Sequence, residues 1–304
     1  MNSRFTLTKQ RWSGGIACWD EKESLEEFIA RADAALYVSK NKESIVTIAP
    51  PKNLLVKMPS WNKLIPQMLE KQAVHMAYQP IVNLRTRQPI GYEALARPIG
   101  MEASEGIEGL FTIASKIGKA PDLDWLCRRL AIEEIKLPKE RLLFINVSAN
   151  SLFESPHEIE LMENLLEKRG MKPWEIVLEL NEKELYRDTS RITEVLSLYR
   201  KKGFSLALDD VGEGMLSGEF LSIFNADYIK LAKSVIPKSF VLGERTVFDG
   251  LVSWAQENGA VVIAKGVETQ QQLESLTGMG IEIGQGFLLG SPQFQNLTGL
   301  TQDE

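Results

Sequence analysis

From residue 77 onward, short apolar runs alternate with longer stretches in which apolar residues recur every three or four positions. The short runs predict strands and the longer stretches predict amphipathic helices. The predicted strands cover residues 77–84, 91–95, 142–147, 175–180, 205–209, 228–231, 261–264 and 284–288. The helical stretches include residues 123–135, 158–168, 190–202, 244–258 and 270–279. This alternation indicates parallel strands buried on both faces, and their number favours an α/β fold closed into a (β/α)8 barrel.

The first fifty residues predict a separate, small α/β piece. Strand patterns cover residues 4–7, 15–19 and 44–49, and a helical pattern covers residues 25–40. Ser24 is the expected N-cap of that helix, and Glu27 completes a capping box. Prolines then mark a linker, which leads into a helix over residues 64–72. We therefore expect three parts, namely residues 1–50, a linker with its helix over 51–72, and a barrel over 73–304.

Composition limits the kinds of function that the chain can have. A net charge of -6 argues against binding to a nucleic-acid polymer or an anionic membrane. With only two cysteines and two histidines, neither a disulfide framework nor a histidine-rich zinc site is expected. A bound metal would need oxygen ligands, which points to Mg²⁺ or Mn²⁺. The sequence contains no apolar run of membrane-spanning length and no signal-peptide pattern, so we expect a cytoplasmic protein.

Polar residues recur where the predicted strands end. They are Glu93, Asn146, Glu179, Asp209 with Asp210, Lys230, Lys265 with Glu268, and Gln285. A barrel gathers the carboxyl ends of its strands at one mouth, where such proteins place their sites. Several carboxylates at one mouth would repel one another strongly without a cation. Glu93, Asn146, Glu179 and Asp209 would together supply four oxygen ligands for a divalent cation.

The same residues belong to an ordered series of motifs. The series runs through Tyr78-Gln79-Pro80-Ile81, Glu93-Ala94-Leu95, Asn146-Val147-Ser148, Glu179-Leu180-Asn181-Glu182, Leu208-Asp209-Asp210-Val211-Gly212, Asp227-Tyr228-Ile229-Lys230, Gln285-Gly286-Phe287 and Pro292. It resembles the EAL family, the phosphodiesterases that open cyclic di-GMP to a linear dinucleotide. The resemblance covers residues 76–292, and it implies the TIM-like barrel of that family and a place in bacterial second-messenger signalling.

The resemblance also implies individual roles. A first Mg²⁺ or Mn²⁺ would be held by Glu93, Asn146, Glu179 and Asp209, and Asp210 would help to hold a second. Lys230 would orient the attacking water or stabilise charge on the phosphate, and Arg97 would bind a ligand phosphate. The cyclic di-GMP site would comprise Gln79, Glu93, Leu95, Arg97, Asn146, Asp209, Lys230, Glu268, Gln285 and Pro292. Glu182 and Glu268 would brace the loop that follows Asp210.

The N-terminal piece carries a second resemblance. Ser13-Gly14-Gly15-Ile16-Ala17 and the stretch 31–40, which reads RADAALYVSK, resemble the C-terminal end of a GGDEF domain, the diguanylate cyclase fold. The part of that family which carries its signature and binds GTP has no counterpart here. We therefore expect a remnant that packs or docks and that has no cyclase activity.

Three departures from the EAL pattern bear on activity. Lys265 replaces a carboxylate of the family, Ala232 replaces the aspartate of its K-I-D motif, and residues 211–215 differ from its usual loop. An ammonium at Lys265 disfavours a second cation by repulsion. The departures favour a non-hydrolytic cyclic di-GMP receptor or a very weak phosphodiesterase. An active metal-dependent phosphodiesterase and an interaction module that binds no nucleotide stay open, as does a homodimer or another protein partner.

Overall fold

The computed structural model describes residues 14–19, 24–25, 28–29, 31–32, 35, 46–48, 61–99, 106–154, 158–185, 189–212, 221, 224–236 and 246–294. The contacts divide the chain into two units, Met1–Trp61 and Asn62–Glu304. In the described parts of both units, no helix has the length and hydropathy needed to cross a membrane.

The N-terminal unit contains a parallel pair of short strands, β1 (Gly14–Ile16) and β2 (Val46–Ile48). Its described residues between positions 25 and 35 are helical, as the periodicity predicts. Trp19 contacts Phe28 edge-to-face, with ring centroids 5.1 Å apart, so the helix lies against the segment that follows β1. The predicted strand over residues 4–7 and part of the predicted helix lie outside the described residues.

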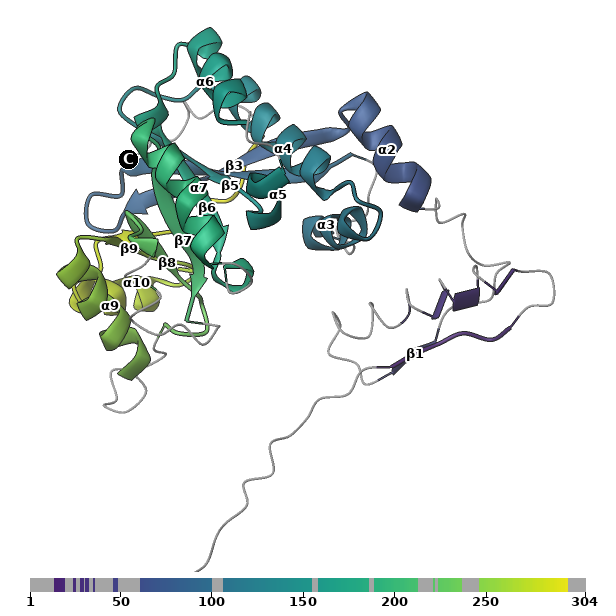
Figure 1. Ribbon diagram of the computed structural model, residues 1–304. Helices are drawn as coiled ribbons and strands as arrows, with labels where there is room; N and C mark the ends of the chain where they lie inside the picture. Colours follow the sequence, from purple (N-terminus) through teal and green to yellow (C-terminus); the bar gives the residue numbers. More distant parts are fainter. Residues whose placement is uncertain are drawn as a thin grey trace, which may run out of the picture. The chain divides into compact units, whose positions relative to one another are not determined.

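The larger unit is a closed eight-stranded barrel surrounded by helices (Figure 1), which confirms the predicted fold class. Its strands are β3 (Val74–Asn83), β4 (Pro89–Pro98), β5 (Leu142–Asn146), β6 (Ile176–Asn181), β7 (Ser205–Val211), β8 (Tyr228–Leu231), β9 (Val261–Ala264) and β10 (Ile283–Gly284). They follow one another around the barrel in chain order, and β10 closes it against β3.

The helices cover the outside of the strands. They are α2 (Trp61–Lys71), α3 (Gly106–Lys116), α4 (Ala120–Glu134), α5 (Ala149–Glu154), α6 (Glu158–Arg169), α7 (Thr189–Lys201), α9 (Thr246–Asn258) and α10 (Gln270–Gly278), with short 3-10 turns η2 (Pro173–Glu175) and η3 (Glu182–Glu184). The start of α10 shows how local sequence sets a boundary. The Thr269 hydroxyl accepts from the backbone N–H of Gln272, whose side chain accepts from the Thr269 N–H in return.

The expectation that all strands are parallel is wrong for β3. This strand runs antiparallel to both β4 and β10, whereas β4 to β10 are parallel to one another. The reason is the connection, because only residues 84–88 separate β3 from β4, and a parallel crossover needs a dozen residues or more. The Asn83 side chain accepts from the N–H groups of Arg85 and Thr86 and so stabilises this turn.

The last predicted strand, residues 284–288, is also shorter in the structure. The strand β10 ends at Gly284, and residues 287–289 form a turn. The chain passes so close to its neighbour at Gly286 that an added Cβ would lie 2.2 Å from the Val267 carbonyl oxygen. Only glycine fits at this close approach, where the chain leaves the strand.

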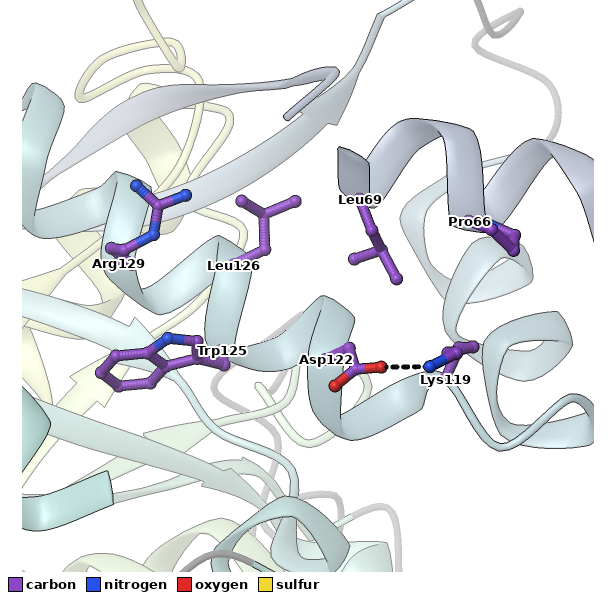
Figure 2. A pocket seen from close by; sticks show the side chains of 7 residues that line it. All are labelled: Pro66, Leu69, Lys119, Asp122, Trp125, Leu126 and Arg129. Atoms are coloured by element: carbon purple, nitrogen blue, oxygen red, sulfur yellow. Dashed lines mark hydrogen bonds and ion pairs between the residues drawn. The ribbon is translucent and has the colours of Figure 1, made fainter. Parts of the chain in front are cut away.

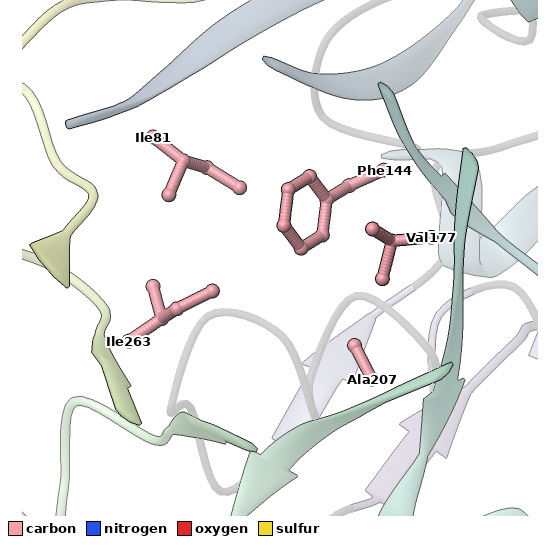
Figure 3. Close-up of a cluster of buried hydrophobic side chains, with 5 residues drawn as sticks. All are labelled: Ile81, Phe144, Val177, Ala207 and Ile263. Atoms are coloured by element: carbon pink, nitrogen blue, oxygen red, sulfur yellow. The ribbon is translucent and has the colours of Figure 1, made fainter. Parts of the chain in front are cut away.

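An apolar layer fills the inside of the barrel. It consists of Ile81, Phe144, Val177, Ala207 and Ile263, which point into the interior from five strands (Figure 3). Each is fully buried, and burial of a large apolar side chain contributes about 1.5–3 kcal/mol. Side chains two residues apart on a strand share a face. The residues two positions further along the four parallel strands, and two positions earlier on antiparallel β3, therefore form a second layer nearer the mouth, and this layer is polar.

Candidate functional site

The polar layer follows directly from the register of the barrel. Asn146, Glu179, Asp209 and Lys265 lie two positions beyond Phe144, Val177, Ala207 and Ile263, respectively. Glu93 pairs with Phe144 on one side and with Gln79 on the other. The structure therefore brings together residues that the sequence places on separate strands, as a site at one mouth requires.

Lys230 lies at the centre of this layer. Its side chain is fully buried, and its Nζ atom lies 2.9 Å from Glu93 Oε2, 2.7 Å from Glu179 Oε1 and 3.9 Å from Asp209 Oδ1. Burial alone would lower the pKa of the Lys230 ammonium, but the carboxylates of Asp209, Glu179 and Glu93 outweigh burial and raise its pKa. Lys230 is therefore a fixed positive charge shared by carboxylates from three strands.

Glu93 is held by amides as well as by Lys230. The Gln285 Nε2 atom donates to Glu93 Oε2 at 2.6 Å, and the Asn146 Nδ2 atom donates to Glu93 Oε1 at 3.2 Å. Gln285 Nε2 also lies 3.3 Å from Gln79 Oε1, and Gln79 in turn donates to the Gly290 carbonyl at 3.1 Å. These contacts connect β3, β4, β5 and the segment after β10 through one carboxylate.

The expectation that Glu93 lies where a strand ends is wrong. Glu93 is in the middle of β4, and the strand continues to Pro98 because antiparallel β3 pairs with it along that whole length. Arg97 is half-buried near the end of β4 and donates to the Ala96 carbonyl at 3.0 Å. Leu95 is half-buried between them on the same face. The predicted strand ended at Leu95. Because β4 continues past this residue, Arg97 lies on the strand itself and further from the polar layer than expected.

Lys265 bridges the two aspartates at the end of β7. Its Nζ atom lies 2.7 and 2.9 Å from the two carboxylate oxygens of Asp209 and 2.6 Å from Asp210 Oδ1. Burial would lower the pKa of Lys265, but Asp209 and the hydrogen bonds to both aspartates outweigh burial, and the pKa is raised. The Lys265 side chain is therefore engaged at the mouth, although a lysine stem is long enough to reach solvent.

The segment after β7 is held in an uncommon conformation. Asp210 has a φ angle of 55°, in the left-handed region that residues other than glycine seldom adopt. Asn181 donates to Asp210 Oδ2 at 3.1 Å, and buried Glu182 accepts from the Gly212 N–H at 2.8 Å. These contacts hold the Asp210 side chain and the backbone at Gly212, and the Glu182 contact is the kind that loop support requires. Residues 213–220, with most of the altered loop, lie outside the described residues.

In the described part of the chain, neither Glu268 nor Pro292 forms a hydrogen bond or ion pair with the carboxylates of the polar layer. Glu268 pairs with Lys233 at 2.6 Å at the exposed surface, and Pro292 is half-buried after β10. The sequence motifs did not predict a site role for Lys233 or Asn181. Asn181 lies next to Glu182 in a motif, so its position gave a signal, whereas Lys233 has no motif of its own.

The pKa values of the two buried glutamates, Glu93 and Glu179, are shifted in opposite directions. Burial would raise the pKa of Glu93, but Lys230, the Gln285 amide and Lys265 outweigh burial and lower that pKa to about 2. Glu179 has its pKa raised well above the ordinary value, because burial and the negative charges of Glu93 and Asp209 outweigh Lys230.

This contrast predicts opposite pH dependences for two variants. Glu93 has a lowered pKa, so its contribution to stability is present above pH 4.5 and is lost as the pH falls towards 2. Glu179 has a raised pKa, so its contribution is present below pH 4.5 and is lost as the pH rises above that value. In chelator-treated buffer, the melting temperature of Glu93→Gln should fall less steeply with decreasing pH than that of the unmodified protein. The melting temperature of Glu179→Gln should fall more steeply. Parallel melting curves against pH for the two variants would contradict the assignment.

The chemistry of the donors fits a hard divalent cation. Glu179 has two fully buried carboxylate oxygens that accept no hydrogen bond from the described residues, although Oε1 has the ion pair with Lys230. Glu93, Asn146 and Asp209 would complete an oxygen set with Glu179. In the described part of the chain, however, no three acidic, cysteine or histidine side chains are arranged as a metal cluster. Lys230 and Lys265 instead lie among these carboxylates.

A pocket of about 380 Å³ lies elsewhere, between α2 and α4 (Figure 2). Its lining residues are Pro66, Leu69, Lys119, Asp122, Trp125, Leu126 and Arg129. Lys119 and Asp122 form an ion pair at 2.7 Å on one side of it. None of the lining residues belongs to the polar layer, so this pocket is separate from the mouth of the barrel.

The fold and the site define a (β/α)8-type barrel with a cluster of carboxylates and lysines at the mouth. A model of the EAL domain family matches residues 62–292, and the chain belongs to this family. Its similarity to a probable cyclic di-GMP phosphodiesterase of Escherichia coli, PdeB, is 27% identity over 77% of this chain and 46% of that protein. The chain spans between 29% and 46% of the length of the first four curated relatives that it matches.

Two solved structures show how similar the fold is. A PaMucR phosphodiesterase in complex with c-di-GMP matches with a TM-score of 0.65 and 26% identity, over 73% of this chain and 97% of that chain. A manganese and cyclic di-GMP complex of Klebsiella pneumoniae BlrP1 matches with a TM-score of 0.66 and 26% identity, over 73% of this chain and 56% of that chain. This EAL domain is thus related to phosphodiesterases and to complexes that contain the dinucleotide.

Proposed function

We propose that this EAL domain is a cyclic di-GMP receptor that hydrolyses its ligand very weakly or not at all. The observation that carries the proposal is the contact of Lys265 with both oxygens of Asp209 and with Asp210. The ligand is proposed from the family and from the relatives that are named for it or bound to it. This function belongs to bacterial second-messenger signalling in the cytoplasm.

The site supports binding through the residues that surround the polar layer. Arg97 can form two parallel hydrogen bonds to a phosphate. Gln79 and Gln285 present amides at the mouth, and each is already oriented by a neighbour. Lys265 adds a positive charge that can neutralise a phosphate oxygen. Together these groups favour a dianionic ligand at a mouth that would otherwise be strongly acidic.

Hydrolysis would require the same residues to hold divalent cations as well. A divalent cation, when bound, supplies Lewis acidity and positive charge at the reacting phosphate. We propose that Glu93, Asn146, Glu179 and Asp209 can hold one such ion, Mg²⁺ or Mn²⁺. Asp210 is the remaining oxygen donor for a second ion, and it shares its charge with Lys265. The ammonium can neutralise charge, but it has no empty orbital to accept an electron pair from oxygen, so it cannot replace the second ion in catalysis.

A weak metal-dependent phosphodiesterase is the second candidate. It is favoured by the intact first oxygen set and by Glu179, whose Oε2 atom is fully buried and accepts no hydrogen bond from the described residues. Lys230 would then turn from the carboxylates towards a phosphate oxygen or the attacking water. In both candidates we propose that residues 1–50 are a GGDEF remnant, residues 51–72 a linker with its helix and residues 73–304 the barrel, and that the remnant packs or binds a partner.

The substitution Lys265→Glu tests the proposal. It restores a carboxylate beside Asp210, so with Mn²⁺ present the formation of linear dinucleotide should rise at least about tenfold, equivalent to about 1.4 kcal/mol of barrier. Chromatography of the product and calorimetry of cyclic di-GMP binding would be measured together. Lys168→Glu makes the same charge change on the exposed side of α6 and should leave both measurements unchanged.

The outcomes separate the alternatives. Rapid hydrolysis by the unmodified protein would make the receptor proposal wrong. Binding without any product in Lys265→Glu would assign the inactivity to Ala232 or to the loop from Val211 to Met215. No binding of cyclic di-GMP by the unmodified protein, with or without Mn²⁺, would leave a protein-interaction module.

A further inference from the structure

The β3–β4 hairpin extends beyond the polar layer. The pairing of these strands continues past Gln79 and Glu93 and ends at Val74 and Pro98. His75 is directly opposite Arg97 in this ladder. At about 3.3 Å per residue, the His75–Arg97 pair lies about 13 Å further out than the Gln79–Glu93 pair. The hairpin therefore carries side chains to the outer edge of the mouth.

His75 faces the mouth and not the outer helices. Met76 and Tyr78 are buried, and the Tyr78 hydroxyl donates to the Ala131 carbonyl of α4 at 3.0 Å. These residues face outward, so the alternation of a strand directs His75 and Gln79 to the opposite face. That face is the one that carries Glu93 and Arg97, because directly opposite residues in an antiparallel pair share a face.

Phe294 lies against His75 on this face. The two rings meet edge-to-face, with centroids 6.3 Å apart and an interplanar angle of 77°. Two backbone hydrogen bonds between Tyr78 and Gln293, of 2.8 and 3.0 Å, fix the chain just before Phe294. The Phe294 side chain is nevertheless 60% exposed, and nearby in the ladder Ile99 is 48% exposed. An exposed aromatic group on a fixed backbone, in contact with the histidine that is paired with Arg97, is a suitable surface for a ligand.

We propose that Phe294, supported by His75, stacks a guanine base of the cyclic dinucleotide whose phosphate Arg97 binds. This inference rests on the proposed function, and it assigns base recognition to residues outside the motifs. Every nucleobase has a π face, and aromatic side chains of nucleotide-binding proteins stack bases without reading their edges. An Arg at the phosphate and a ring at the base would hold two parts of one nucleotide from the same hairpin edge.

The substitution Phe294→Ala should weaken cyclic di-GMP binding about 5- to 150-fold, the range for loss of one stacked base. Phe294→Tyr keeps the ring and should restore affinity, whereas Phe294→Leu keeps only apolar bulk and should not. A cyclic dinucleotide with 2-aminopurine in place of one guanine gives a second signal. Its fluorescence should be quenched on binding to the unmodified protein and to Phe294→Tyr, and it should stay bright on Phe294→Ala.

Controls distinguish this inference from the proposed function. Trp174→Ala removes an equally exposed ring from the opposite end of the barrel, before β6, and should leave affinity and quenching unchanged. Equal affinity and equal quenching in Phe294→Ala would overturn the stacking role and leave the receptor function intact. No binding by the unmodified protein would overturn both. Melting temperatures close to that of the unmodified protein would show that the exposed substitution leaves the fold in place.

Discussion

Replacing Arg128 by methionine should lower the free energy of unfolding by about 3–5 kcal/mol, because it breaks a fully buried ion cluster. The Arg128 side chain has no exposed surface. Its Nε atom lies 2.8 Å from Asp124 Oδ2, and one terminal nitrogen lies 2.5 Å from Glu158 Oε2. Without the guanidinium, two buried carboxylates of α4 and α6 would face each other without a positive charge. Urea unfolding would measure the loss.

The neighbouring arginine supplies a matched control. Arg129 pairs with Glu133 at 2.5 Å, but its side chain is partly exposed and lines the pocket between α2 and α4. Arg129→Met should therefore change stability by no more than about 1 kcal/mol. Replacing Arg128, Asp124 and Glu158 together by apolar residues should regain much of the loss, since no unpaired charge is left. A small loss in Arg128→Met alone would contradict the account.

The Arg128 cluster also reaches the site. Asp124 Oδ1 accepts from the Ser148 N–H at 3.0 Å, and Glu184 Oε2 accepts from the Ala149 N–H at 2.7 Å. Both bonds hold the chain directly after Asn146, where β5 ends. Loss of Arg128 should therefore disturb the position of Asn146 as well as stability.

The second large effect is expected from Lys230→Met. This change removes the positive charge shared by Glu93, Glu179 and Asp209, and it should lower stability by about 3–5 kcal/mol in chelator-treated buffer. Protonation of Glu179 limits the cost, so the loss should grow as the pH rises. Mn²⁺ should raise the melting temperature of the variant more than that of the unmodified protein, because the ion would neutralise the same carboxylates.

Lys233 is the control for this prediction, since it lies three residues further along the chain. Its side chain is 58% exposed and pairs with Glu268 at 2.6 Å. Lys233→Met should change stability by no more than about 0.5 kcal/mol, with no added response to Mn²⁺. Equal effects at Lys230 and Lys233 would show that the shared buried charge is not what stabilises the mouth.

The barrel was predictable from the alternation of apolar strands with amphipathic helices, and the polar residues from their positions near the ends of those strands. Apolar strands with a two-residue period place Glu179 and Asp209 on the same face as Val177 and Ala207, whichever strands pair. The direction of β3 was not predictable in this way. Residues 84–88 lack the glycine-containing pairs that signal a tight hairpin, so β3 and β4 looked like two more strands of the parallel set.

The contacts within the site could not be predicted from local sequence patterns. That Lys230 is shared between β4, β6 and β7 depends on closure of the barrel, which no local pattern contains. Lys265 has a flexible stem, and its contact with two aspartates depends on the left-handed backbone at Asp210. His75 and Phe294 are distant in sequence and belong to no motif. Only the β3–β4 ladder and the pairing of Tyr78 with Gln293 bring them together.

The reversed direction of β3 decides where the barrel is joined to what precedes it. In a barrel of parallel strands, the first strand begins at the end opposite to the mouth. Here β3 begins at Val74, which is paired with the last residue of β4, so the chain enters the barrel at the mouth. The helix α2 ends at Lys71, and Gln79 follows eight residues later. A twist or pull applied through α2 would reach Gln79 along a single strand, so upstream segments have a short mechanical path to the mouth of the barrel.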